Sequence, residues 1–133
     1  MLDAAQLAEL SRLAEAAAHH AYAPYSHFSV GAAILLHSGD IVTGCNVEIA
    51  SFRLTTCAEQ TAITSAVALR GPGIRIRAIA VANLNATASQ PCGACRQTIH
   101  EFSTPDTIVF FPAEGGTITE TTMTDLLPAA FRL

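Results

Sequence analysis

Hydrophobic residues recur every three to four positions at the start of the chain, and further on they form short apolar runs. The first pattern predicts an amphipathic helix over residues 3–20, because residues at that spacing share one face of a helix. The face is formed by Leu7, Leu10, Ala14 and Ala17. Pro24 excludes a longer helix. The first apolar run, residues 28–36, predicts a buried strand.

The polar stretch 37–40 predicts a hairpin turn that leads into a return strand at 41–44. Helices and strands then alternate along the rest of the chain. The expected elements are a helix at 57–69, a strand at 76–82, a helix at 92–102, a strand at 107–111, a weaker strand around Ile118 and a helical turn near 126–128. Strands joined by helices indicate a mixed sheet with helices on its faces, so the expected class is α/β. The length predicts one domain, residues 1–133.

The composition agrees with a folded chain and limits its partners. Half of the residues are hydrophobic and 14% are charged, which is unlike a disordered chain. The net charge is −4 and all seven basic residues are arginines without a basic stripe, so we expect no nucleic-acid partner. No apolar run is long enough to span a bilayer, and the N-terminus lacks signal-peptide features. Four cysteines in such a chain predict reduced thiols and a cytoplasmic protein.

Three of the four cysteines lie at the starts of predicted helices. Cys57 belongs to the stretch T-C-A-E-Q, while Cys92 and Cys95 belong to P-C-G-A-C-R-Q. The free N–H groups and the positive dipole end at a helix start stabilise thiolates. A redox-active C-x-x-C pair with an inert Cys57 is the alternative, but the two stretches together favour zinc. Cys45 has no ligand-spaced partner and is interpreted as a small buried hydrophobe.

Three thiolates leave the fourth position of a zinc ion open, as in catalytic rather than structural sites. Glu59 follows Cys57 by two residues. It could be a solvated glutamate in a first helical turn, but beside a zinc ligand it is expected to move protons for a metal-activated water. The histidines lack ligand spacing. Three of them are expected on helix surfaces, namely His19, His20 and His100.

Six motifs occur in a characteristic order along nearly the whole chain. They are Tyr22-Ala-Pro-Tyr25-Ser-His-Phe28, Gly31-Ala-Ala, Gly44-Cys-Asn46-Val-Glu48, Cys57-Ala-Glu59, Pro91-Cys-Gly-Ala-Cys-Arg-Gln97 and Leu126-Leu-Pro-Ala-Ala-Phe131. In this order they resemble the small homotetrameric cytidine deaminases of nucleoside salvage. The resemblance implies a three-layer α/β/α sandwich with a mixed five-stranded sheet. It also implies hydrolytic deamination of cytidine and 2′-deoxycytidine to uridine and 2′-deoxyuridine, with release of ammonia.

The same resemblance implies the roles of individual residues. One zinc ion per chain would be held by Cys57, Cys92 and Cys95 and would activate a water for attack on C4 of cytosine. Glu59 would take the water's proton, deliver it to N3 and help to protonate the departing amine.

The substrate would be held by residues from several parts of the chain. The resemblance implies that the N–H of Ala58 binds the base carbonyl O2 and that Asn46 and Glu48 bind the ribose hydroxyls. Phe28 would pack beside the base. Phe131 of a neighbouring subunit would stack on it, so that the active form would be a homotetramer.

Three positions depart from the pattern expected of this family: Ile49 stands where asparagine is usual, Phe52 where tyrosine is usual and Gln60 where arginine is often found. Gln60 can donate hydrogen bonds to sulfur but cannot offset the charge of three thiolates, a role left to Arg96. These changes keep open a modified or N4-substituted cytosine nucleoside, or a blasticidin-type antibiotic, as substrate. A non-catalytic zinc-stabilised binding module would need a fourth protein ligand, and Cys45 is the only spare cysteine.

Overall fold

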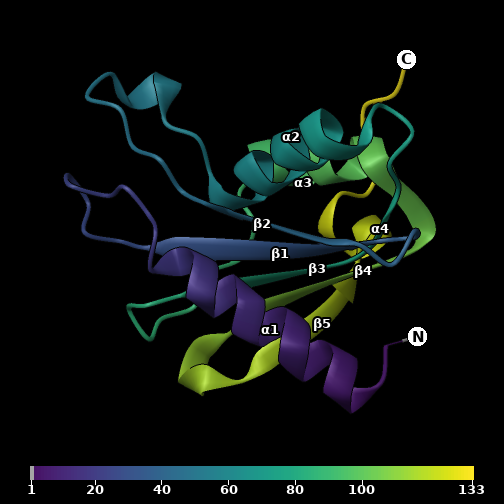
Figure 1. The fold of residues 1–133 in the computed structure, drawn as a ribbon, viewed down its shortest axis with the longest axis horizontal. Coiled ribbons are helices and arrows are strands. Elements are labelled where there is room, and N and C mark those ends of the chain that lie inside the picture. The colour runs from purple at the N-terminus through teal and green to yellow at the C-terminus, as the bar shows by residue number, and fades with distance from the viewer. Residues whose placement is uncertain (1) are drawn as a thin grey trace.

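A mixed sheet of five strands forms the middle of the computed structural model, which describes residues 2–133 (Figure 1). Helices and strands follow one another in the predicted order. The elements are α1 (Ala4–Ala18), β1 (Val30–Leu36), β2 (Ile41–Cys45), α2 (Ala58–Arg70), β3 (Ile76–Asn83), α3 (Gly93–Phe102), β4 (Ser103–Pro112), β5 (Ile118–Thr122) and α4 (Met123–Leu126). Two short 3-10 helices that were not predicted lie at Phe52–Leu54 and Glu114–Gly116. No helix within residues 2–133 is long and apolar enough to cross a membrane.

The strand order in the sheet is β2-β1-β3-β4-β5. Strands β3 and β4 are parallel, and the other three neighbouring pairs are antiparallel. In the central register Ile79 pairs with Ile34 on one side and with Val109 on the other. The α/β class and the mixed five-stranded sheet are therefore confirmed.

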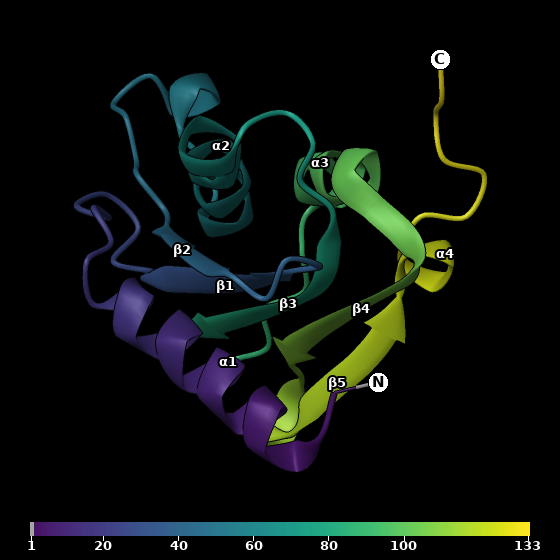
Figure 2. The ribbon, with the colours of Figure 1, turned by 45° about the vertical axis from the view of Figure 1, so that its right-hand side comes forward.

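Helices cover both faces of the sheet: α1 lies on one face and α2 with α3 on the other (Figure 2). The side chains of β1 alternate between these layers, because successive residues of a strand point to opposite faces. Ala33 and Leu35 pack with Leu10 of α1, whereas Ile34 packs with Ile63 of α2. Burial on both faces explains why β1 is apolar throughout and confirms the three-layer α/β/α arrangement.

Two glycines let the helices approach the sheet closely. A Cβ atom added at Gly31 would overlap the carbonyl oxygen of Ala14 in α1. One added at Gly44 would overlap the backbone nitrogen of Ala62 in α2. The second contact fixes the start of α2 against the end of β2, where several of the expected site residues lie.

Strand β4 begins four residues earlier than expected, at Ser103 rather than 107. The polar residues 103–106 resemble a loop in sequence, but Ser103 pairs with Ile76, and the register then shifts before Ile108 pairs with Ala78. The buried hydroxyl of Thr107 closes this irregularity, donating to the carbonyl of Ile76 at 2.6 Å and accepting from the N–H of Thr104 at 2.8 Å.

Candidate metal centre and active site

The three cysteines of the two motifs meet where α2 and α3 begin. Cys57 is the N-cap of α2 and Cys92 is the N-cap of α3, while Cys95 lies in the first turn of α3. The two helices are in contact on the same face of the sheet (Figure 2). Free N–H groups and the positive ends of two helix dipoles therefore converge on one group of thiols.

The spacing of the sulfur atoms fits a zinc ion. The three Sγ atoms all lie within 4.8 Å of one another, and those of Cys57 and Cys92 are 3.8 Å apart. Zinc–sulfur bonds of about 2.3 Å at tetrahedral angles require sulfur atoms about 3.8 Å apart. The donor set fits the metal, and it leaves one coordination position open to water or substrate.

The pKa values of the Cys57 and Cys95 thiols are shifted in opposite directions. A hydrogen bond from the Cys95 thiol lowers the pKa of Cys57 to about 7, against the opposing effects of burial and of the Glu59 carboxylate. The pKa of Cys95 is raised, first because its thiol donates to Cys57 and then because it is buried. Cys57 therefore ionises before Cys95, as expected for a thiol at a helix start.

Cys45 is separate from this group. It is the last residue of β2, half-buried, and it does not belong to the sulfur cluster found among residues 2–133. Burial raises the pKa of its thiol, so it stays neutral where Cys57 can ionise.

Gln60 and Arg96 adjoin the cysteines but contact backbone rather than sulfur with their side chains. The Gln60 side-chain oxygen accepts from the backbone N–H of Cys57 at 3.2 Å, and the backbone N–H of Gln60 donates to the Cys57 sulfur. Together the two bonds form a capping box. The Arg96 guanidinium donates to the carbonyls of Pro91 at 2.8 Å and Leu126 at 2.9 Å. Arg96 therefore links the loop before Cys92 to the end of α4.

Glu59 lies in the first turn of α2 and only 4% of it is exposed. It lines a pocket of about 160 Å³ together with Cys57 and Cys92. Burial raises the pKa of its carboxyl group, outweighing the opposing hydrogen bonds of its own backbone and of Cys95. A buried carboxyl with a raised pKa beside a metal-ligand cluster can both take up and release a proton.

Ala58 and Asn46 line the same pocket. Ala58 is the first residue of α2, so its N–H has no acceptor within the helix. The Asn46 side chain donates to the carbonyl of Phe28 at 2.8 Å and accepts from the N–H of Val30 at 2.9 Å. Its amide nitrogen and oxygen each retain the capacity for one more hydrogen bond.

Glu48 and Phe28 do not form part of the lining of this pocket. The Glu48 carboxylate accepts from the N–H groups of Tyr25 at 3.0 Å and Ser26 at 3.1 Å. A hydrogen bond from the Ser26 side chain is the largest cause that lowers the pKa of Glu48, and the two backbone N–H groups lower it further. Phe28 is half-buried, and its backbone is held by Asn46.

Phe131 is not brought into the pocket of its own chain. Its side chain is 69% exposed, and it borders a separate hollow together with Arg75 and His100. The Gln97 side chain donates to its carbonyl at 3.2 Å. The segment after α4 thus runs beside α3 toward the C-terminus (Figure 2).

Four residues of the pocket lining were not identified in the sequence: Val30, Thr55, Ser89 and Gln90. Ser89 and Gln90 directly precede Pro91-Cys92, so proximity to a predicted ligand was an available signal. Val30 and Thr55 are ordinary core and loop residues by sequence. Of the departing positions, Ile49 and Phe52 are both exposed, and the Phe52 ring makes an edge-on contact with Tyr25 at 5.8 Å.

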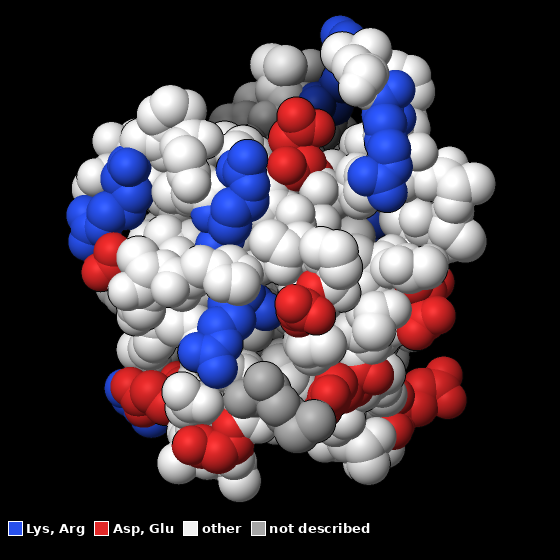
Figure 3. Space-filling model, turned by 90° about the vertical axis from the view of Figure 1, so that its right-hand side faces the viewer, with Lys and Arg blue, Asp and Glu red and all other residues white. Residues whose placement is uncertain are grey.

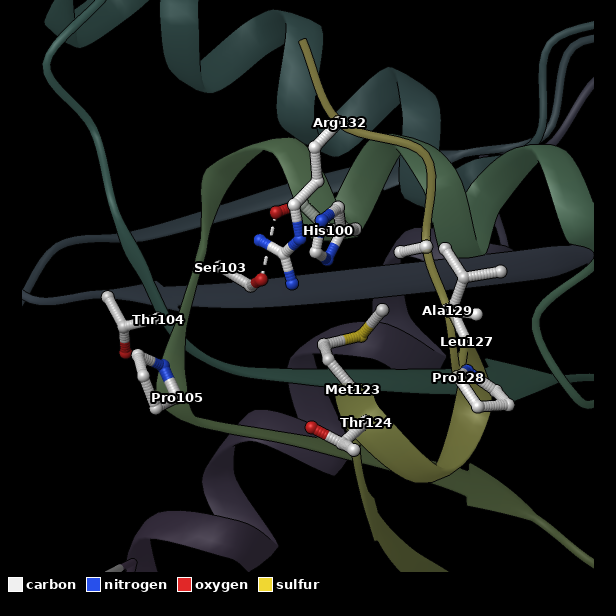
Figure 4. A pocket seen from close by; sticks show the side chains of 11 residues that line it. His100, Ser103, Thr104, Pro105, Met123, Thr124, Leu127, Pro128, Ala129 and Arg132 are labelled. Carbon is white, nitrogen blue, oxygen red and sulfur yellow. Dashed lines mark hydrogen bonds between the residues drawn. The ribbon is translucent and has the colours of Figure 1, made fainter.

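A larger cavity, about 300 Å³, lies elsewhere, between the end of α3, the start of β4 and the C-terminal segment (Figure 4). Arg132, His100 and Ser103 are among the residues that line it, and the buried Thr104 hydroxyl has no hydrogen-bond partner within residues 2–133. Its lining includes neither a cysteine nor a carboxylate side chain.

On the face drawn in Figure 3, arginines and acidic residues are interspersed.

Comparison with known proteins gives one consistent result. Residues 4–111 match the family model described as cytidine and deoxycytidylate deaminase zinc-binding region. The chain is 45% identical to the cytidine deaminase of Sporosarcina psychrophila over 116 residues, covering 86% of this chain and 83% of that protein. It is 42% identical to the cytidine deaminase of Mycobacterium tuberculosis over 117 residues, covering 88% and 83%. The crystal structure of cytidine deaminase from Burkholderia pseudomallei superposes with a TM-score of 0.84 at 45% identity, covering 93% of this chain and 98% of that one.

Proposed function

Because the chain belongs to the cytidine and deoxycytidylate deaminase family, we propose that it catalyses the zinc-dependent hydrolytic deamination of cytidine and 2′-deoxycytidine. The products are uridine or 2′-deoxyuridine and ammonia. The observation that carries the proposal is the burial of Glu59 in the pocket that also contains Cys57 and Cys92. A structural zinc site needs no such carboxyl group.

The three cysteines hold the metal and Glu59 moves the protons. Zinc, when bound, acts as a Lewis acid that brings the pKa of a water molecule near neutrality. Glu59 accepts a proton from that water at its carboxylate. Because burial raises its pKa, the Glu59 carboxylate takes up this proton readily and passes it to N3 of the cytosine ring. It then moves a second proton, from the hydroxyl added at C4, to the amine, which leaves as ammonia.

The substrate roles follow from position. The free N–H of Ala58 at the start of α2 donates to the base carbonyl O2, where the helix dipole favours an acceptor. Asn46 binds a ribose hydroxyl with the hydrogen-bonding capacity that Phe28 and Val30 leave unused. Glu48 binds a second hydroxyl with its remaining carboxylate oxygen, and Phe28 packs beside the base.

Gln60 and Arg96 keep the metal ligands in place. Gln60 holds the N–H of Cys57 and supplies its own N–H to the Cys57 sulfur. Arg96, which directly follows Cys95, donates to the carbonyl of Pro91, the residue before Cys92. Its positive charge offsets part of the charge of the thiolates.

The active form is a homotetramer in which Phe131 of a neighbouring subunit stacks on the base. Support comes from the 69% exposure of a large aromatic side chain that does not reach its own pocket. The enzyme acts in pyrimidine salvage in the cytoplasm, a compartment where cysteines remain reduced and available to zinc.

The decisive experiment follows the loss of cytidine ultraviolet absorbance with protein that carries one zinc per chain, and identifies uridine and ammonia as products. Glu59→Gln should retain zinc but lose at least about 100-fold in kcat, the usual contribution of a general acid–base group. Glu15→Gln, on the exposed face of α1, is the matched control. Zinc-loaded protein that leaves cytidine and 2′-deoxycytidine unchanged would refute the proposal.

A further inference from the structure

Two asparagines hold the segment that carries Phe28, one on each side of the chain. The Asn46 side chain contacts the carbonyl of Phe28 and the N–H of Val30. The Asn85 side chain contacts the residues on either side of Phe28, donating to the carbonyl of His27 at 3.1 Å and accepting from the N–H of Ser29 at 3.3 Å.

This alternation matches the geometry of extended backbone. A carbonyl and the N–H two residues later point to the same side of an extended chain, and the next such pair points to the opposite side. Each asparagine therefore takes the place of a neighbouring strand, supplying one donor and one acceptor. Residues 27–30 are therefore held on both sides where the chain enters β1.

His27 shows why this segment needs support. Its φ angle is +57°, a left-handed conformation that is unfavourable for a residue with a side chain. Asn85 binds the carbonyl of this same residue and the N–H two positions later. The bond between the N–H of Leu84 and the carbonyl of Ser29, 3.1 Å, adds a third contact between the two loops.

Asn85 is itself fixed within its loop. The Asn83 side chain accepts from the N–H of Asn85 at 3.0 Å and donates to the carbonyl of Thr87 at 2.8 Å. This loop connects β3 to Ser89, which lines the pocket. Asn85 therefore connects two parts of the chain. One is the loop that ends at Ser89 in the pocket, and the other is the segment that carries Phe28.

We infer that Asn85 is a positioning residue for substrate binding, which fixes Phe28 against the pocket through the backbone of His27 and Ser29. The inference rests on the proposed deaminase function and on the proposed role of Phe28. Asn85 is 56 to 58 positions away from its partners in the sequence and does not line the pocket. It acts on the substrate only through the segment that it holds.

Asn85→Ala removes both contacts and should raise KM for cytidine about fivefold to tenfold while kcat stays within about twofold, because the lost bonds orient substrate rather than react. Asn85→Asp keeps the acceptor for Ser29 and loses the donor to His27, so its KM should lie between the KM of wild type and that of Asn85→Ala. Gln6→Ala is the control for general stability, since Gln6 also makes a side-chain bond to backbone, at the start of α1.

Amide hydrogen exchange supplies a readout that does not depend on activity. The N–H of Ser29 should exchange about tenfold faster in Asn85→Ala and at the wild-type rate in Gln6→Ala. In a Phe28→Ala background, adding Asn85→Ala should raise KM by less than it does in the wild type, because the two residues act as a unit.

An unchanged KM in Asn85→Ala, or unchanged exchange at Ser29, would overturn the inference. Additive effects of Phe28→Ala and Asn85→Ala would also overturn it. If the wild-type protein does not deaminate cytidine, the proposed function fails, and the exchange rate at Ser29 still decides whether Asn85 holds this segment.

Discussion

The sulfur atoms of Cys57 and Cys92 lie 3.8 Å apart although the residues are 35 positions apart in the sequence. The contact exists because each cysteine is the N-cap of a helix and the two helices pack together on one face of the sheet. Metal binding should therefore tie the starts of α2 and α3 to each other, so that loss of the metal loosens the pocket as well as removing its chemistry.

Cys57→Ser should reduce bound zinc from one ion per chain to little or none after dialysis, as measured by metal analysis. The melting temperature should fall by about 10 °C, because zinc bound at a concentration far above its Kd adds several kcal/mol to the stability of the folded state. Cys45→Ser is the matched control and should keep its zinc, since Cys45 lies outside the cluster. Equal zinc loss in both variants would contradict the assignment of the ligands.

Gly44→Ala should lower the free energy of unfolding by about 3 kcal/mol, at the upper end of typical overpacking costs. The added methyl group would overlap the backbone of α2 at Ala62 and lie 2.8 Å from the carbonyl oxygen of Ala58, so α2 must move. Gly73→Ala is the control, because no atom lies within 4 Å of its added Cβ. Urea denaturation measures both variants, and comparable losses would show that close helix–strand contact is not the cause.

The sequence was sufficient for the features that depend on local patterns. The uniform apolar run of β1 and the helical spacing in α1 led to correct elements, and cysteines at two helix starts led to a cluster that the structure brings together. The Asn85 contacts were not predicted, because they depend on how two irregular loops pair across 56 to 58 positions. The early start of β4 was missed for a similar reason. It depends on the hydrogen bond from Thr107 to the carbonyl of Ile76, and these two residues are 31 positions apart in the sequence.

Glu48→Gln should lower the melting temperature at neutral pH, and the difference from wild type should vanish in acid. The Glu48 pKa is depressed on folding, chiefly by the Ser26 side chain and then by the N–H groups of Ser26 and Tyr25. A depressed pKa means that the folded state prefers the carboxylate, so this stabilisation is present above the unfolded-state value of 4.5. It is lost as the pH falls through the lower folded-state value.

Thermal melts of wild type and Glu48→Gln between pH 7 and pH 3 test this sign. Glu15→Gln, at an exposed position of α1, is the control and should match wild type throughout. A difference that widens as the pH falls would mean that Glu48 does not hold residues 25 and 26 as a carboxylate.

Phe131→Ala should raise KM for cytidine about tenfold, since stacking of an aromatic side chain on a base contributes about 1–3 kcal/mol. If Phe131 acts on a neighbouring subunit, this defect can be repaired by mixing. In a tetramer of Phe131→Ala and Glu59→Gln subunits, a pocket with an intact Glu59 can receive Phe131 from the other kind of subunit. Co-expressed mixtures should therefore recover a class of sites with the wild-type KM.

The control mixture pairs Phe131→Ala subunits with subunits that carry both Glu59→Gln and Phe131→Ala, and it should show no recovery. Gel filtration of each preparation establishes that the same assembly forms. If the first mixture keeps the KM of Phe131→Ala alone, the C-terminal segment does not complete a neighbour's site. The exposed Phe131, whose backbone carbonyl accepts a hydrogen bond from Gln97 of α3, would then have a role within its own subunit.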